Sequence, residues 1–216
     1  MLRNDFYKGL YRDSLGTVTF SYLLHSLQFS VEAQRALQHV FPRWGINLSV
    51  LGQHSVSSFA GRQLNAAMSV YLPGLSHQHH IVLQGAWQER DTLGQLSFGN
   101  RLAYSRGFTG RYFSRMWKTG VNYHFPLWLP DIGVASIVYV NRIRANLFYD
   151  YTLVYSRNKK QTAPQRSAGG ELFFDTKWWN QHPVSVGCRL SYLLDRDQFD
   201  GYRGWFAELI LPVSLF

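Results

Sequence analysis

Three histidines close together in the chain are the first candidates for chemistry, because imidazole is a common metal ligand. They are His77, His79 and His80. They follow Pro73-Gly74 in what is interpreted as a short turn, where polar side chains are expected in any case. No carboxylate lies near them in the sequence to complete a set of ligands. We therefore expect no metal centre here, and the sequence predicts no cofactor.

The acidic stretch at residues 195–201 is a second candidate, because it is similar to a calcium loop. An EF-hand loop needs acidic or amide side chains at its positions 1, 3 and 5 and a glycine at position 6. Counted from Asp195, the third acidic residue is Asp200 at position 6, and Gly201 follows one place later. This spacing does not match the EF-hand pattern, so the stretch is interpreted as a polar loop. An irregular cation site is the alternative.

A hydrolytic site would need a nucleophile activated by a nearby base. His124 could serve Ser114, and Asp150 could serve a more distant serine. No motif of the Gly-x-Ser-x-Gly or His-Glu-x-x-His type supports either pairing. We therefore predict that the protein is not an enzyme, and a hydrolase is kept as an alternative.

Arg106 is the charged residue whose setting is most informative. It lies in the longest predicted connection, directly before Gly107, which permits a sharp backbone reversal, and Phe108, an apolar anchor. A guanidinium held away from water needs paired acceptors, because an unpaired buried charge is very costly. The acidic candidates are Asp150 and then Glu171. The alternative is an ordinary solvated turn.

The elements that must position these residues are strands, because the chain alternates with a period of two. Between 183 and 192, for example, Val186 and Leu190 fall on one face and Arg189 on the other. The same alternation recurs around residues 17–24, 46–51, 64–72, 81–88, 116–125 and 145–155. Segment 27–38 has a composition that favours helix, but it is interpreted as a continuation of the first strand or as a second strand.

This pattern predicts an all-β chain of nine or ten antiparallel strands, with more than half of the residues in strands and under a tenth in helix. The period also separates two faces. The residues expected on the apolar face include Val121, Leu147, Tyr149, Val184, Val186, Cys188 and Leu190. The residues expected on the opposite face include Lys118, Asn122, Asp150 and Arg189.

The connections between the strands are of two kinds that alternate along the chain. Turns with proline lie at 41–45, 72–75, 125–130 and 181–183, and those at 41–45 and 125–130 are also rich in aromatic residues. Longer or more polar connections lie between them, at 89–111, 156–167 and 195–203. In an up-and-down sheet every other connection lies at the same end, so one end has turns and the other has polar loops. Outer-membrane barrels have this asymmetry.

Composition narrows the class of protein further. Of 216 residues only 16% are charged, against ~25% in a typical soluble domain, and 16% are aromatic. The longest uncharged apolar run, 134–140, is far shorter than the ~20 residues of a spanning helix. A single cysteine, Cys188, excludes an intramolecular disulfide framework. The net charge of +9 is scattered apart from a cluster at 157–160, so we expect anionic lipid or lipopolysaccharide as a partner rather than nucleic acid.

Alternation alone does not decide which face points inward. A soluble lipocalin-like barrel that binds an apolar ligand would turn its apolar face inside. The non-apolar face here is rich in serine, glycine, asparagine and glutamine, as a membrane-barrel lumen would be. Aromatic residues cluster near the strand ends, at Trp44, Tyr71, Trp87, Trp128, Trp178, Trp179 and Trp205. Both features favour a transmembrane β-barrel, or part of one.

The chain resembles the surface-antigen barrel of the Omp85 superfamily over roughly residues 80–216. The resemblance is carried by 105–108 (Ser-Arg-Gly-Phe), by a strand ending at 123–127 (Tyr-His-Phe-Pro-Leu) and by 146–150 (Asn-Leu-Phe-Tyr-Asp). The turns at 42–45 and 71–75 extend it toward large outer-membrane proteins of Bacteroidetes. In that family an Arg-Gly-(Phe/Tyr) motif sits on a long extracellular loop that folds back into the lumen.

The resemblance implies roles for particular residues. Arg106, Gly107 and Phe108 match the loop motif, and Asp150 matches a lumen-facing aspartate. The family often has a glutamate on the intervening strand where this chain has Asn122, so Glu171 would have to substitute for it. At the C-terminus, Leu215 and Phe216 resemble the signal that the barrel-assembly machinery reads.

The implied location is the outer membrane of a Gram-negative bacterium, with outer-membrane lipid, lipopolysaccharide, the barrel-assembly machinery and a polypeptide substrate as partners. The implied function is insertion or translocation of polypeptide or lipid, or anchoring of a missing periplasmic domain. Because the family barrel has more strands than are predicted here, residues 1–216 are interpreted as a single barrel domain at the C-terminal part of a longer protein. The alternatives are the lipocalin-like barrel and an outer-membrane barrel hydrolase.

Overall fold

The computed structural model describes residues 21–34, 39–56, 60–91, 98–110, 113–134, 137–156, 162–179, 181–198 and 200–211. Strands hold 69% of these residues, and the sheet is antiparallel throughout. The prediction of an all-β, up-and-down chain is confirmed. None of the residues so described belongs to a helix long and apolar enough to cross a membrane.

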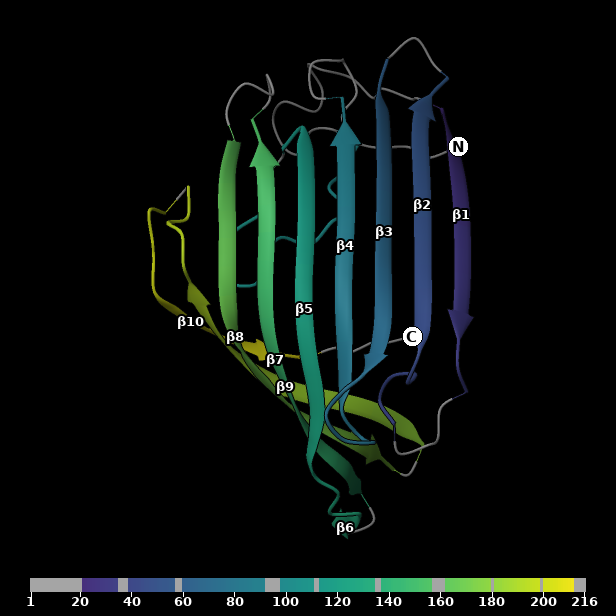
Figure 1. Ribbon diagram of the computed structural model, residues 1–216, viewed down its shortest axis with the longest axis vertical. Coiled ribbons are helices and arrows are strands. Elements are labelled where there is room, and N and C mark those ends of the chain that lie inside the picture. The colour runs from purple at the N-terminus through teal and green to yellow at the C-terminus, as the bar shows by residue number, and fades with distance from the viewer. Residues whose placement is uncertain are drawn as a thin grey trace, which may run out of the picture.

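Ten strands make one sheet (Figure 1). They are β1 (Tyr22–Glu32), β2 (Gly45–Ser55), β3 (Arg62–Pro73), β4 (His80–Arg90), β5 (Arg115–Trp128), β6 (Ile132–Val134), β7 (Val138–Tyr155), β8 (Thr162–Trp178), β9 (His182–Leu193) and β10 (Trp205–Ile210). Each strand pairs with its sequence neighbour, except that β5 pairs with β7 and the short β6 pairs only with the start of β7.

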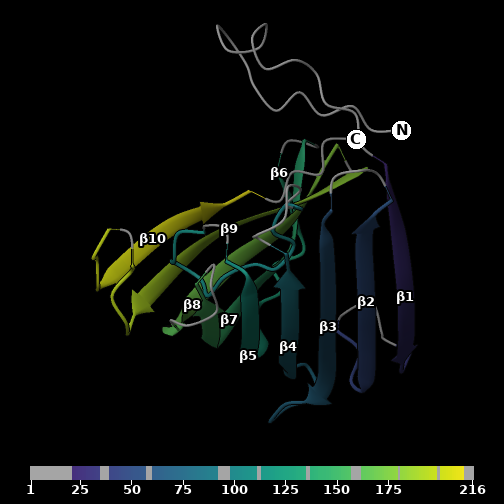
Figure 2. The same cartoon turned by 90° about the horizontal axis from the view of Figure 1, so that it is seen from above.

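The sheet curves strongly but does not close into a barrel within the described residues (Figure 2). Its edges are β1 and β10, and the pairing runs β1-β2-β3-β4-β5-β7-β8-β9-β10. This path holds nine strands, and every neighbouring pair is antiparallel, so β1 and β10 run in the same direction. Pairing one edge with the other would create a parallel seam, whereas membrane barrels are antiparallel. The described strands therefore form an open antiparallel sheet, not a closed barrel.

The apolar residues of the sheet lie on its exposed face. In register across four strands, Leu83, Val121, Tyr149 and Ala168 lie side by side on this face. Val121 is 47% exposed, whereas Asp150, which follows Tyr149 and so points the other way, is fully buried. The buried face also holds the polar side chains of Asn122, Asn146, Thr152, Gln165 and Ser191. We call the buried polar face the concave face and the apolar one the convex face.

Several element boundaries differ from those predicted. The first strand ends at Glu32 and β2 begins at Gly45, so only the first part of segment 27–38 continues the first strand, and residues 35–38 lie outside the described residues. Strand β8 begins at Thr162, inside a stretch interpreted as a polar connection, because residues 162–165 pair with the end of β7. The small hairpin strand β6 was not predicted. Residues 17–20, the basic cluster at 157–160, and Leu215 and Phe216 lie outside the described residues.

Candidate functional site

The connection between β4 and β5 brings residues 98–110, which we call the inner segment, against the concave face of the sheet (Figure 2). Ser105 Oγ lies 2.8 Å from Thr152 Oγ1 on β7 and donates to the Gln165 carbonyl of β8 at 2.8 Å. The Thr109 amide donates to Asp197 Oδ2 at 3.0 Å, beyond the end of β9. Three different parts of the chain therefore hold the segment in place.

Arg106 is the centre of these contacts. Its backbone amide donates to Asp150 Oδ2 at 3.2 Å, and its Nε lies 3.3 Å from the same oxygen. Its Nη1 lies 3.5 Å from Glu171 Oε1, and its Nη2 donates to Asn122 Oδ1. The guanidinium carbon also lies 4.0 Å from the centre of the Phe148 ring. We call these five residues the Arg106 clamp.

The expected ion pairs of Arg106 with Asp150 and Glu171 are thus present. Asn122 contributes a neutral acceptor to the same guanidinium. The Arg106 side chain is only 15% exposed and the carboxylate of Asp150 is fully buried. Such pairs are little screened by solvent, so removing one partner leaves a costly unpaired charge.

Two glycines make room for the clamp, and sequence reasoning did not find them. Gly169 pairs with Phe148 across β7 and β8, and a Cβ at Gly169 would lie 2.8 Å from the ring. Gly120 pairs with Asp150 across β5 and β7, and a Cβ there would lie 2.9 Å from Asp150 Oδ1. The role of each glycine can be recognised only once the strand register is known, because it depends on which residue lies opposite the glycine.

The other two residues of the loop motif fix the turn itself. Gly107 has a φ of 86°, in the region that favours glycine, and a Cβ at this position would lie 2.8 Å from Leu193 Cδ1. Phe108 is buried, and its amide donates to the Ser105 carbonyl at 3.1 Å. The motif therefore forms a tight reversal that presents Arg106 to the concave face.

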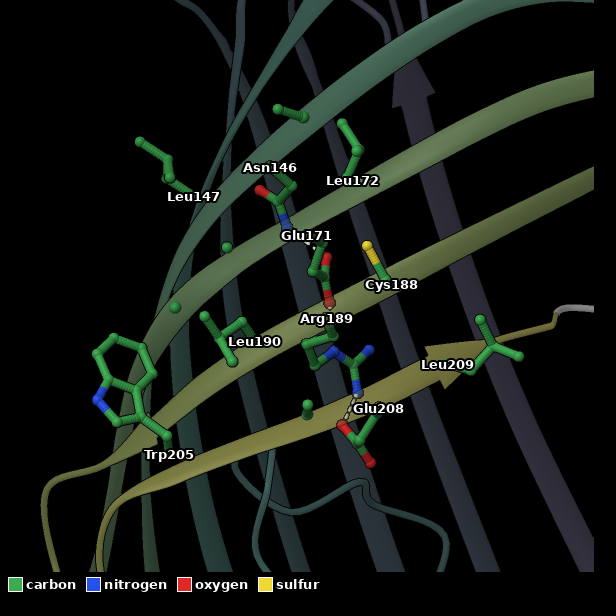
Figure 3. Close-up of a pocket in the computed structure, with 14 residues that line it drawn as sticks. Asn146, Leu147, Glu171, Leu172, Cys188, Arg189, Leu190, Trp205, Glu208 and Leu209 are labelled. Carbon is green, nitrogen blue, oxygen red and sulfur yellow. Dashed lines mark hydrogen bonds and ion pairs between the residues drawn. The ribbon is translucent and has the colours of Figure 1, made fainter.

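From Glu171 a chain of polar contacts continues across the last four strands (Figure 3). Asn146 Nδ2 donates to Glu171 Oε2 at 2.7 Å, and Arg189 Nε donates to Glu171 Oε1 at 2.6 Å. Arg189 Nη1 then donates to Glu208 Oε2 at 2.9 Å on β10. Leu147, Leu190 and Leu209 alternate with these residues on the convex face. The contacts link the clamp to the edge strand β10.

The charged side chains in and next to the clamp are equal in number, three cations and three anions. The cations are Arg106, Lys118 and Arg189, and the anions are Asp150, Glu171 and Glu208. Lys118 Nζ lies 4.0 Å from Asp150 Oδ2 and donates to the Tyr104 carbonyl of the inner segment at 2.9 Å. This arrangement suits a lock that holds a loop against a sheet.

Of the two hydrolytic pairings considered from the sequence, that of His124 with Ser114 is not assembled. Ser114 Oγ donates to the Ser156 carbonyl at 2.6 Å. Ser114 directly precedes β5, whereas His124 lies ten positions further along the chain, about 33 Å at the usual rise of a strand. His124 instead faces Phe41, with ring centres 4.6 Å apart.

The two candidate metal clusters are also dispersed. His79, which precedes β4, contacts Tyr123, whereas His80, the first residue of β4, contacts His39. Asp195 forms a bidentate pair with Arg166, and Asp197 accepts the Thr109 amide. Among the residues that the structure describes, no group of three or more histidine, cysteine or acidic side chains could hold a metal ion. Side-chain hydrogen bonds from Arg166 lower the pKa of Asp195 below its usual 3.8.

Comparison with known proteins gives no relative for this chain: no family model, no curated protein and no solved structure matches it. Any functional assignment therefore depends on the residues and their geometry. The features that carry it are the Arg106 clamp and the separation of the sheet into an apolar and a polar face.

Proposed function

We propose that this chain is part of an outer-membrane β-barrel of the Omp85 type. Its role would be the insertion or translocation of polypeptide or lipid, or the anchoring of a periplasmic domain in the membrane. The site of action would be the bacterial outer membrane, and the partners would be its lipids, lipopolysaccharide and the barrel-assembly machinery. The proposal does not include an enzymatic step.

The observation that carries the membrane assignment is the exposure of the apolar face. Leu147, Leu190 and Val121 are about half exposed, while Asp150, Thr152 and Gln165 are fully buried. A soluble lipocalin-like barrel would require the reverse, with its apolar face packed inside. A contiguous exposed apolar face of this extent is costly in water and favourable in lipid.

Aromatic and charged residues bound this apolar face in the way expected of a membrane band. Trp87, Trp117 and Trp205 lie near the strand ends that join the connections 91–114 and 194–204. Trp44, Trp128 and Trp178 lie at the opposite strand ends. Charged side chains of the convex face, such as Glu89, Arg115 and Arg166, lie toward the first of these ends, where they form ion pairs. Girdles of aromatic residues flank the apolar band of known outer-membrane barrels.

The Omp85 type is supported by the Arg106 clamp. The motif residues Arg106, Gly107 and Phe108 lie on the longest connection and turn back onto the concave face, beside Asp150. In a closed barrel the concave face would be the lumen. A loop locked into the lumen would limit what passes and would brace the strands that it touches, from β5 to β9.

The test is membrane insertion of the full chain. We expect the purified protein to incorporate into vesicles of outer-membrane lipids, to resist extraction by alkaline carbonate, and to migrate differently on gels before and after boiling. Recovery as a monodisperse soluble protein without detergent, or release by carbonate, would contradict the proposal and favour the soluble barrel.

A further inference from the structure

A polar cavity of about 290 Å³ lies on the concave face, on the side of the Arg106 clamp away from the inner segment. Its walls come from β3, β4, β5, β7, β8 and β9 and from Phe41, which precedes β2. Three guanidinium groups line it, those of Arg106, Arg144 and Arg189, against the single carboxylate of Glu171. The lining itself therefore holds more cations than anions, and Asp150, Asp175 and Glu208 pair with these arginines from outside the lining.

Two of these arginines have hydrogen-bonding capacity left over. Arg144 uses only its Nε, which donates to both oxygens of Asp175 at 3.3 and 3.0 Å. Arg189 uses its Nε and Nη1 on Glu171 and Glu208. The terminal nitrogens of Arg144 and the Nη2 of Arg189 are not hydrogen-bonded to any residue that the structure describes.

Two other side chains in the same wall each have one buried polar atom without a partner. His124 Nδ1 and Asn146 Oδ1 are both buried, in residues that are 8% and 1% exposed, and neither has a hydrogen-bond partner among the described residues. Buried polar atoms of this kind are normally satisfied. An oxyanion in the cavity would accept a hydrogen bond from His124 Nδ1 in the tautomer that carries a proton there, whereas Asn146 Oδ1 is itself an acceptor and needs a donor such as water.

Arg144 is also held rigidly, which prepares it to bind a ligand. Its guanidinium carbon lies 4.1 Å from the centre of the Phe173 ring, and Asp175 fixes its Nε. Phe173 and Phe41 supply apolar surface to the same cavity. A planar guanidinium with free nitrogens beside aromatic rings suits an oxyanion that is attached to an apolar group.

We infer that this cavity is a binding site for a small organic oxyanion, a carboxylate or phosphate on an apolar or aromatic body, with Arg144 as its main cationic contact. Arg189 and His124 complete the set of contacts. The inference goes beyond the proposed function, because it concerns a ligand of the concave face and does not depend on what the barrel transports.

The experiment uses phenyl phosphate and benzoate as probes, with benzyl alcohol as their uncharged counterpart. Binding to the purified full chain is measured by titration calorimetry. Arg144→Gln is compared with Arg142→Gln, a matched control, because Arg142 also pairs with Asp175, at 2.8 Å, but does not line the cavity. NMR gives a second readout. The ring resonance of His124 is assigned by its loss in His124→Gln, and its shift on adding a probe is then followed in the unsubstituted protein.

We expect saturable binding of at least one of the two anions. Arg144→Gln should weaken it by about tenfold or more, whereas Arg142→Gln should change it by less than about twofold. The His124 resonance should shift on binding, and the tighter of the two probes identifies the anionic group. Three results would overturn the inference. Benzyl alcohol could bind as tightly as the anions, the two substitutions could weaken binding equally, or neither anion could bind saturably while the His124 resonance stays unmoved. These outcomes are independent of membrane insertion, which tests the proposed function.

Discussion

Gly120 lies directly opposite Asp150 in the pairing of β5 with β7, and a Cβ at Gly120 would approach Asp150 Oδ1 to 2.9 Å. The carboxylate cannot easily move aside, because its other oxygen is fixed by the backbone amide and the side chain of Arg106. The absence of a side chain at Gly120 therefore leaves room for the carboxylate of Asp150 on the neighbouring strand. This relationship makes the fit of the inner segment sensitive to a single methyl group.

Gly120→Ala should lower the free energy of unfolding by about 1–3 kcal/mol, the usual cost of forcing extra volume into a packed site. Gly85→Ala is the matched control, since a Cβ at Gly85 on the neighbouring strand meets no atom within 4 Å. Urea unfolding in detergent, followed by tryptophan fluorescence, compares the two. Equal stability of both variants would show that Asp150 is not tightly held.

Gly169 and Gly170 are adjacent on β8, and the structure separates their roles. A Cβ at Gly169 would overlap the Leu190 carbonyl oxygen, which belongs to the backbone and cannot yield, whereas one at Gly170 would make only ordinary contacts at 3.7 Å. Gly169→Ala should therefore destabilise the protein by about 3 kcal/mol, and Gly170→Ala by well under 1 kcal/mol. Thermal denaturation of the two variants checks the order, and a reversed order would contradict the β8–β9 register.

Removing the clamp arginine should cost far more than removing an arginine of the convex face. Arg106→Ala leaves the carboxylate of Asp150 buried with only Lys118 nearby, so we expect a loss of about 3 kcal/mol. Arg115→Ala breaks a more exposed pair with Glu89 and should cost less than about 1 kcal/mol. Protease sensitivity of residues 98–110 gives a local readout. Similar losses of stability in the two variants would show that the clamp contributes no more than an ordinary surface ion pair.

The Arg166–Asp195 pair predicts a pH dependence at the loop after β9. Because Arg166 lowers the pKa of Asp195 in the folded state, the pair stabilises the loop fully above the usual carboxyl pKa of 3.8. That stabilisation is lost as the pH falls through the lower folded-state value. Hydrogen exchange of the Arg166 amide, which donates to Asp195 Oδ2 at 2.9 Å, should therefore speed up below about pH 4 beyond the intrinsic trend. In Asp195→Asn this extra acceleration of exchange should be absent. If the acceleration persists in that variant, a group other than Asp195 causes it.

The sequence predicts much of this structure because a period of two fixes the faces of a strand independently of its partners. Val121 and Asn122 are placed on opposite faces by their position in the alternation alone. The association of Arg106 with Asp150 could also be expected, since few acidic residues share the face to which its loop returns.

Other features could not be predicted, because they depend on pairing rather than on local pattern. The roles of Gly120 and Gly169 follow from the residues opposite them, which only the register defines. Strand β6 spans just three residues, too few for a periodic signal. The polar start of β8 has the composition of a loop and becomes a strand because β7 extends far enough to pair with it.

The central claim is that the convex face meets lipid, and neighbouring residues of β2 test it most directly. Leu48 lies on the convex face and Ser49 on the concave face. Cys188 is the only cysteine, so Leu48→Cys and Ser49→Cys can each be labelled singly with a fluorophore in a Cys188→Ser background. In vesicles, we predict that brominated lipid quenches the label at position 48 strongly and the label at position 49 weakly, with aqueous iodide giving the opposite order. Equal quenching of both labels by iodide, or the reverse assignment of the two faces, would contradict the account.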